Sequence, residues 1–122
     1  MNTDYVVVGS GIAGLTFALS VAESGRVVVI TKKNDAESAT NMAQGGIAAV
    51  VDDTDSFVAH VEDTLEAGEG LCDREAVEIA VRGGPRAVAR LIEWGADFTT
   101  EQRGGGAPAF ALGQEGGHSA RT

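Results

Sequence analysis

The stretch DYVVVGSGIAGLTFALSVAESGRVVVITK, residues 4–32, decides how the rest of the chain is interpreted. Its opening run YVVV is β-branched and aromatic, which is typical of a strand buried on both faces. A G-x-G-x-x-G turn follows at residues 9–14, and apolar residues then recur at helical spacing over 15–24. Gly25 is expected to end that helix, and residues 26–31 form a second β-branched strand. The order of these elements predicts a parallel βαβ unit of the α/β class.

Each glycine of the turn has a mechanical role in such a unit. Gly9 would make the tight turn, Gly11 would let a pyrophosphate approach the backbone, and Gly14 would let helix and strand pack closely. The helix N-terminus adds N–H groups and the positive end of the helix dipole. The spacing therefore predicts a dinucleotide-binding site in a Rossmann-like fold.

The second strand departs from the usual pattern at its end. Dinucleotide-binding units commonly place Asp or Glu there to bind a ribose hydroxyl. This chain has Thr31 and Lys32 instead, and its first acidic residue, Asp35, comes a little late. Two explanations stay open: Lys32 meets a phosphate or polar edge of the cofactor, or the ribose is held from elsewhere.

The composition limits the class of protein and of partner. The chain of 122 residues is at most one domain, and its net charge of −9 argues against nucleic acid or an anionic membrane as a main partner. The single Cys72 excludes an internal disulfide, fits a cytoplasmic location and is expected to be buried and unreactive. The sequence predicts no signal peptide and no transmembrane span.

Small and polar residues dominate the loop after the second strand. Residues 38–50 lead through a Gln-Gly-Gly turn into an apolar exit. This pattern indicates an extended loop whose backbone comes close to a flat or polar group. The alternative is a surface loop with a Gly-Gly turn that leads into a strand.

Three helices are expected in the middle of the chain. The first runs to about Ala67 with its N-cap among residues 52–56, and His60 on it is interpreted as structural or solvent-facing. Its expected apolar face consists of Phe57, Val58, Val61 and Leu65.

The other two helices are separated by a glycine pair. Asp73 is the expected N-cap of the second helix, and Gly83-Gly84 is expected to break it. Pro85 would then begin the third helix, which places Trp94 in the core.

The end of the chain predicts a β-hairpin and then a polar loop. Residues 97–102 and 107–112 flank a glycine-rich tip. The last loop carries an acid, a histidine, a hydroxyl and an arginine: Glu115, His118, Ser119 and Arg121. Such a cluster can position and deprotonate a polar substrate, although ordinary polar loops look alike. No third parallel strand appears by Thr122, which indicates a piece of a longer protein.

Four motifs carry a resemblance to a known family. With GSGIAG, ATNMAQGGIAAV, HVEDTLEAGEGLCDREAVE and GQEGGHSAR, the chain resembles the L-aspartate oxidase family, which belongs with the succinate dehydrogenase and fumarate reductase flavoproteins. The resemblance implies that residues 1–122 are the N-terminal part of a Rossmann-like FAD-binding domain. The rest of that domain and a cap domain would lie beyond residue 122.

The resemblance also implies a bound FAD. Its pyrophosphate would lie over residues 10–13, Lys32 would make a basic contact, and the loop at 39–46 would wrap the flavin ring. The cofactor contacts implied are Gly9, Ser10, Gly11, Ile12, Ala13, Gly14, Lys32, Ala39, Thr40, Asn41, Met42, Ala43, Gln44, Gly45 and Gly46. In the dehydrogenase relatives a histidine in this loop carries FAD covalently. The loop here has none, so FAD is expected to be bound non-covalently.

The reaction implied is oxidation of L-aspartate to iminoaspartate in NAD biosynthesis. A hydride would pass to the flavin, and oxygen or fumarate would reoxidise it. Glu115 matches the family's active-site glutamate near the substrate amino group, and His118 and Ser119 would line the same pocket. No metal is expected, and the next enzyme of the pathway, quinolinate synthase, is a candidate partner.

Two other functions stay open at this stage. A fumarate reductase-like or succinate dehydrogenase-like flavoprotein would share the first three motifs, and Glu115 beside Gly-Gly-His is the feature that argues against it. A nicotinamide-dinucleotide-binding module is suggested by Lys32, which could accept a 2′-phosphate. The Gln-Gly-Gly loop argues against that module, because such domains have no need to wrap a ring. A non-catalytic binding domain is also possible for the chain by itself.

Overall fold

The strand, glycine turn, helix and second strand occur in the expected order at the start of the chain. A computed structural model describes residues 2–32, 46–102, 108–114 and 116–121. The chain divides into two units, Met1–Gly45 and Gly46–Thr122, and each is described by itself.

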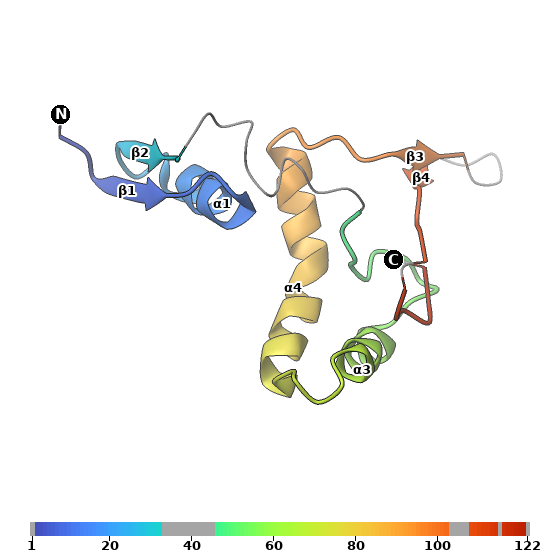
Figure 1. Ribbon diagram of the computed structural model, residues 1–122. Helices are drawn as coiled ribbons and strands as arrows, with labels where there is room; N and C mark the ends of the chain where they lie inside the picture. The colour runs from blue at the N-terminus through green and yellow to red at the C-terminus, as the bar shows by residue number, and fades with distance from the viewer. Residues whose placement is uncertain (1, 33–45, 103–107, 115, 122) are drawn as a thin grey trace. The chain divides into compact units, whose positions relative to one another are not determined.

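The first unit is a parallel βαβ unit, as predicted. β1 (Tyr5–Val8) pairs in parallel with β2 (Val27–Ile30), with Tyr5 opposite Val27. α1 (Ile12–Val21) connects the strands and packs against both of them (Figure 1). Parallel strands need such a crossover, because a tight hairpin can join only antiparallel neighbours.

Two expectations for this unit are wrong in detail. β1 is not buried on both faces: Val7 is 7% exposed but Val8 is 82% exposed, because α1 is the one helix of the described residues that packs on this two-stranded sheet. α1 ends at Val21 instead of continuing to Gly25. Gly25 lies in the turn that follows, where a Cβ atom would come within 3.0 Å of the Asp4 Cβ. It therefore permits close packing of the turn and does not end the helix.

The second unit is built on two helices that pack against each other. α3 (Phe57–Ala67) and α4 (Arg74–Glu93) lie together in Figure 1. The side chains of Ser56 and Asp73 each accept a backbone N–H of the first helical turn, at 3.1 and 2.8 Å. Both N-cap predictions are confirmed, and the caps satisfy N–H groups that have no partner inside a helix.

The predicted break at Gly83-Gly84 is wrong. α4 continues through the glycines with Pro85 inside it, although an interior proline costs a helix about 3 kcal/mol. The residues of its inner side recur at helical spacing before and after the pair: Val77, Val81, Gly84, Val88 and Leu91. Burial of this continuous face outweighs the local preferences.

The predicted hairpin is confirmed but is short. β3 (Thr100–Glu101) pairs with β4 (Ala109–Phe110) in antiparallel register. Phe98 and Phe110 add an edge-to-face ring contact with centroids 6.2 Å apart. The pair of strands supplies the backbone that leads into the last loop of the chain.

The core of the second unit is small. Its buried apolar residues are Ala49, Val61, Val88 and Leu112. Trp94 at the end of α4 is half-buried, with the Arg90 guanidinium 4.6 Å from its ring centroid.

Two expected core residues lie elsewhere. Val58 is 71% exposed, so it does not belong to the buried face of α3. Cys72 is also exposed, which corrects the expectation of a buried cysteine. Its sulfur lies against the backbone of Gly68, where an added Cβ atom would overlap it.

Candidate functional site

The glycine turn has the geometry that a dinucleotide site needs. Gly9 has a φ of +106°, a backbone conformation that other residues rarely adopt. At Gly14 an added Cβ atom would overlap the carbonyl oxygen of Gly9 and lie 3.3 Å from the Val7 side chain. The roles expected for Gly9 in the turn and for Gly14 in close helix–strand packing are both confirmed.

The start of α1 fits an anionic group. Gly11 is its N-cap, no side chain makes a cap hydrogen bond there, and the first turn has no acidic residue. The first N–H groups of any helix lack partners within the helix, and its dipole favours negative charge at this end. The residues present therefore fit a pyrophosphate.

Two polar residues at the ends of the strands lie beside the turn. Ser10 is 7% exposed, and its Oγ lies 3.0 Å from the Oγ1 of Thr31. The Ser10 side chain thus joins the ends of the two strands, and its backbone is the part available to a cofactor. Lys32 follows directly and is exposed.

Several predicted site residues lie outside the described residues. These are Glu115 and the first seven residues of the flavin loop, Ala39, Thr40, Asn41, Met42, Ala43, Gln44 and Gly45. Gly46 is exposed, and no atom of the residues that the structure describes lies within 4 Å of an added Cβ there.

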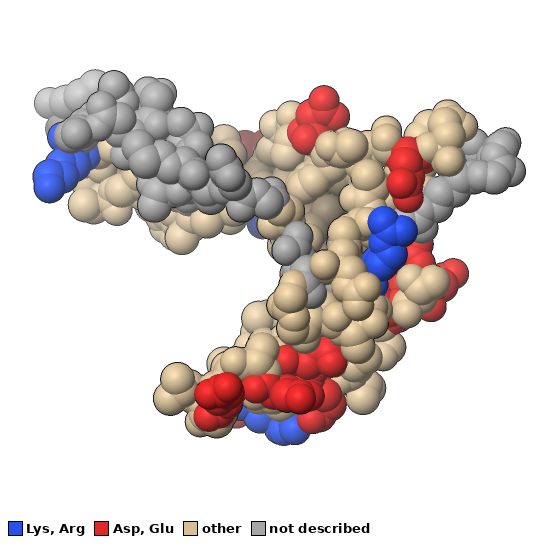
Figure 2. Space-filling model, turned by 45° about the vertical axis from the view of Figure 1, so that its right-hand side comes forward, with Lys and Arg blue, Asp and Glu red and all other residues tan. Residues whose placement is uncertain are grey.

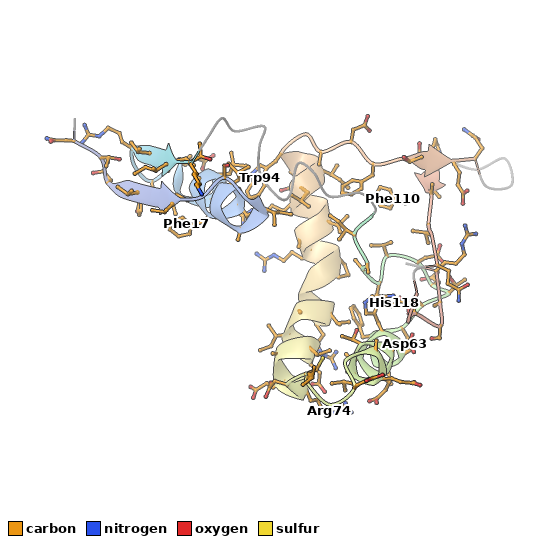
Figure 3. The ribbon with its side chains drawn as sticks, viewed as in Figure 1. Phe17, Asp63, Arg74, Trp94, Phe110 and His118 are labelled. Carbon is orange, nitrogen blue, oxygen red and sulfur yellow. The ribbon has the colours of Figure 1, made fainter. Side chains whose placement is uncertain are left out.

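The last loop is attached to α3. Both the backbone N–H and the hydroxyl of Ser119 donate to the Asp63 Oδ2, at 2.6 and 2.7 Å. The Gln114 side chain donates to the carbonyl of His118 at 3.2 Å, and Arg121 donates to the Leu112 carbonyl at 2.5 Å. Figure 3 shows His118 and Asp63 near each other, one on the loop and one on the helix.

The Ser119 bonds alter the charge behaviour of Asp63. Hydrogen bonds from the backbone and then the side chain of Ser119 lower the pKa of the Asp63 carboxyl, and His118 and His60 add smaller favourable contributions. The Ser119 hydroxyl therefore helps to hold the loop against α3. That it also lines a substrate pocket, as the resemblance implies, stays a prediction.

Within the second unit, a row of polar groups leads from the last loop past α3 to Asp55. His118 Nε2 lies 3.2 Å from His60 Nε2, and His60 Nδ1 lies 3.3 Å from Asp55 Oδ2. His60 is only 5% exposed, so of the two interpretations, structural or solvent-facing, the structural one is confirmed. It is a buried residue paired on both ring nitrogens.

The sequence carried a signal for this cluster. His60 and Asp63 are three residues apart, a spacing that puts two side chains on the same face of a helix. His118 and Ser119 are consecutive, so the loop presents two polar groups to that face. The pairing joins residues far apart in sequence, and local patterns alone could not predict it.

Charged side chains outside the cluster form a solvated surface. Figure 2 shows acidic residues gathered where α3 is followed by α4. The exposed acids there are Glu62, Glu66, Glu69, Asp73 and Glu75. Arg74 donates to both carboxylate oxygens of Glu62 and lowers the pKa of that carboxyl.

Two classes of feature are absent from the described residues. None of the helices there has the length and apolar character needed to cross a bilayer. That part of the chain also contains no group of three or more His, Cys, Asp or Glu residues placed to hold a metal ion.

The comparison with protein families agrees with the glycine-turn geometry. The profile of the FAD binding domain family matches residues 4–122. The chain belongs to this family. FAD is therefore the cofactor of the family to which this chain belongs.

Individual relatives carry a more specific name. The chain is 51% identical to L-aspartate oxidase 1 of Ralstonia nicotianae over 99% of its own length and 22% of that protein. It is 49% identical to the L-aspartate oxidase of Yersinia pestis over 98% of its length and 22% of that protein. A chloroplastic tobacco L-aspartate oxidase is 48% identical over 97% of the chain and 18% of that protein.

Solved structures with the same fold come from the related dehydrogenases and reductases. The chain matches the Mycobacterium smegmatis Sdh1 complex with a TM-score of 0.85 and 32% identity, over 98% of this chain and 20% of the other. The E. coli quinol fumarate reductase FrdA gives a TM-score of 0.83 and 31% identity, over 99% and 20%. The chain thus spans about a fifth of the length of the relatives it matches.

Proposed function

We propose that this chain is the N-terminal, FAD-binding part of an enzyme that oxidises L-aspartate to iminoaspartate, the first step of NAD synthesis from aspartate. Identity to the proteins named L-aspartate oxidase, at 48–51% over nearly the whole chain, carries the proposal. Identity to the dehydrogenase and reductase structures is 31–32%.

The βαβ unit would hold the cofactor. The turn at residues 9–14 and the N-terminus of α1 would bind the pyrophosphate through backbone N–H groups. Lys32 would lie beside it, and residues 39–46 would surround the ring. Bound FAD supplies the acceptor for the two electrons and the hydrogen of the substrate Cα–H bond. The absence of histidine from residues 39–46 supports non-covalent binding.

The last loop would approach the substrate amino group. Glu115 would bind the ammonium as a carboxylate, and His118 would accept one of its protons. The bonds from Ser119 to Asp63 would hold His118 in place beside α3. The groups that bind the substrate carboxylates are assigned to the part of the enzyme beyond this chain.

The proposal also covers the surroundings of the enzyme. Oxygen or fumarate would reoxidise the cofactor, quinolinate synthase would take the product, and the protein would work in the cytoplasm. The single cysteine of the chain supports that compartment. The plant relatives carry the word chloroplastic in their names.

The second candidate is a fumarate reductase-like or succinate dehydrogenase-like flavoprotein. The TM-scores of 0.85 and 0.83 with members of that class favour it. The family match with an FAD binding domain gives no support to the nicotinamide alternative.

A hybrid enzyme tests the proposal. Residues 4–122 replace the matching segment of the Ralstonia relative, and the purified protein is loaded with FAD. We expect peroxide formation that depends on L-aspartate and is not supported by succinate. A hybrid that holds FAD and reduces fumarate with an artificial electron donor, but does not oxidise aspartate, would favour the second candidate.

A further inference from the structure

A buried row of polar groups in the second unit ends at an unpaired nitrogen. The row runs from the Asp55 carboxylate through His60 to the Nε2 of His118. Within the described chain, the Nδ1 of His118 is buried and has no hydrogen-bond partner. A buried polar atom without a hydrogen-bond partner destabilises a folded protein. Asp55 and His60 in the same row do have hydrogen-bond partners. The unpaired Nδ1 of His118 therefore calls for a functional explanation.

Asp55 determines which groups of the row donate hydrogen bonds and which accept them. The side chain is only 2% exposed, and its Oδ1 accepts the backbone N–H of Ser56 at 2.6 Å. Ser56 is the N-cap of α3, and the positive end of the helix dipole there stabilises a carboxylate. A carboxylate oxygen only accepts, so the Nδ1 of His60 carries the proton that faces Asp55.

The tautomer of His60 then fixes that of His118. A neutral imidazole has one N–H group, so a His60 protonated on Nδ1 has a bare Nε2. The Nε2 of His118, 3.2 Å away, must therefore be the donor of the pair. This leaves the Nδ1 of His118 without a proton, as a buried acceptor.

We propose that Asp55 and His60 are positioning residues that hold His118 as the Nε2–H tautomer, which makes Nδ1 the proton acceptor for the ammonium group of an amino-acid substrate. The nature of the substrate rests on the proposed function, whereas the tautomer follows from the contacts. In the transfer, an N–H bond of the ammonium breaks and an N–H bond forms at Nδ1. The positive charge moves to the His118 imidazolium, whose Nε2–H continues to donate to His60.

Two carboxylates support that charge. Asp55 acts through His60, and Asp63 lies three residues after His60 on α3 and holds Ser119, the neighbour of His118. The attraction between Asp63 and both imidazoles contributes to the lowered pKa of the Asp63 carboxyl.

The first test reads the tautomers directly. The chain is labelled with ¹⁵N-histidine, and two-bond ¹⁵N–¹H spectra assign which ring nitrogen of each histidine is bare. We expect a bare Nδ1 on His118 and a bare Nε2 on His60. Asp55→Asn should reverse both, because its oxygen stays on the Ser56 N–H and its amide N–H₂ turns toward His60. A His118 that carries its proton on Nδ1 in the unsubstituted chain would overturn the proposal.

The second test uses the FAD-loaded hybrid and two substitutions at His60, each of which keeps one of the two hydrogen-bonding roles of the imidazole. His60→Gln keeps an acceptor near the place of Nε2, and His60→Asn keeps only a donor near the place of Nδ1. We expect kcat/KM for aspartate to fall by about 100-fold in the Asn variant, the size of effect of a positioned base. The Gln variant should retain most of the activity, and both should hold FAD as before. Glu62→Gln, at an exposed site on the same helix, is the control.

The outcomes separate this inference from the proposed function. Equal losses in the Gln and Asn variants would mean that His60 is a packing residue, and the inference would fail with the function intact. Spectra with the expected tautomers, together with a hybrid that does not oxidise aspartate, would support the tautomer assignment and contradict the assignment of the substrate. If the chain gives no dispersed spectra, the Gln and Asn comparison in the hybrid decides.

Discussion

Gly14 shows how one missing side chain makes the cofactor site. Gly14→Ala places a methyl group against the Gly9 carbonyl and near Val7. We expect a loss of about 1–3 kcal/mol in the free energy of unfolding, together with a loss of FAD from the hybrid. Urea denaturation and the visible spectrum measure the two effects. Ser20→Ala, at an exposed site on the same helix, is the control and should keep FAD; retention of FAD by the Gly14 variant would contradict the close packing.

Asp63 makes the attachment of the last loop depend on pH. Its pKa is lowered in the folded chain, so its stabilising contribution is complete above the usual carboxyl value of about 4 and is lost as the pH falls through the lowered value. We expect the amide proton shift of Ser119 to titrate below that usual value. The Asp63→Asn variant should abolish this titration. A Ser119 shift that stays constant throughout acid titration would contradict the attachment.

For single residues, the sequence predicts the local backbone conformation and close packing that a position requires. It does not predict contacts between residues that lie far apart in the chain. The roles of Gly9 and Gly14 follow from spacing, because a turn and a close approach are local demands. The structural role of His60 is among the sequence interpretations, but its partners are not, because they lie five residues before it and 58 residues after it. Only the folded chain brings His118 to that side of α3.

At the scale of elements, the two glycines inside α4 differ in their surroundings. Among the described residues no atom lies within 4 Å of a Cβ added at Gly83, whereas at Gly84 the Cβ of Ala49 would be 3.2 Å away. Gly83→Ala should stabilise the chain by about 0.5–1 kcal/mol, the usual gain in a helix. Gly84→Ala should lose that gain to crowding against Ala49. Equal stabilities of the two variants in thermal denaturation would show that Ala49 does not pack on α4.

The same helix shows which element boundaries can be read from sequence. Ser56 and Asp73 are identified by their capping side chains, which act within one turn. The continuity of α4 depends on its apolar face. The helical spacing of the inner-face residues from Val77 to Leu91 continues across Pro85, so the sequence does show this face. Breaking signals are weaker than a shared buried face.

At the scale of the whole molecule, the chain leaves apolar surface uncovered. Val6, Val8 and Ile30 on the strands of the first unit are 56, 82 and 52% exposed. The relatives are about five times as long as the part this chain matches. We expect the hybrid to unfold at a higher temperature than the chain alone, because the added segments would cover such surface. Scanning calorimetry of the two proteins checks this, and equal melting temperatures would contradict it.

Non-covalent attachment of FAD is also a property of the assembled site. The hybrid is saturated with FAD, desalted and precipitated with acid. We expect the yellow colour in the supernatant, since residues 39–46 contain no histidine that could form a bond to the ring. Colour that stays in the pellet would show that FAD is linked covalently through a residue outside 39–46. The mode of FAD attachment would then no longer distinguish this protein from the dehydrogenases.

The most direct measurement is the anaerobic visible spectrum of the FAD-loaded hybrid during titration with L-aspartate and, separately, with succinate. Two-electron reduction bleaches the flavin band, so the spectrum reports which compound gives up its hydrogen without any assumption about the electron acceptor. The account predicts bleaching by L-aspartate and an unchanged spectrum with succinate. Bleaching by succinate, with no response to L-aspartate, would contradict it.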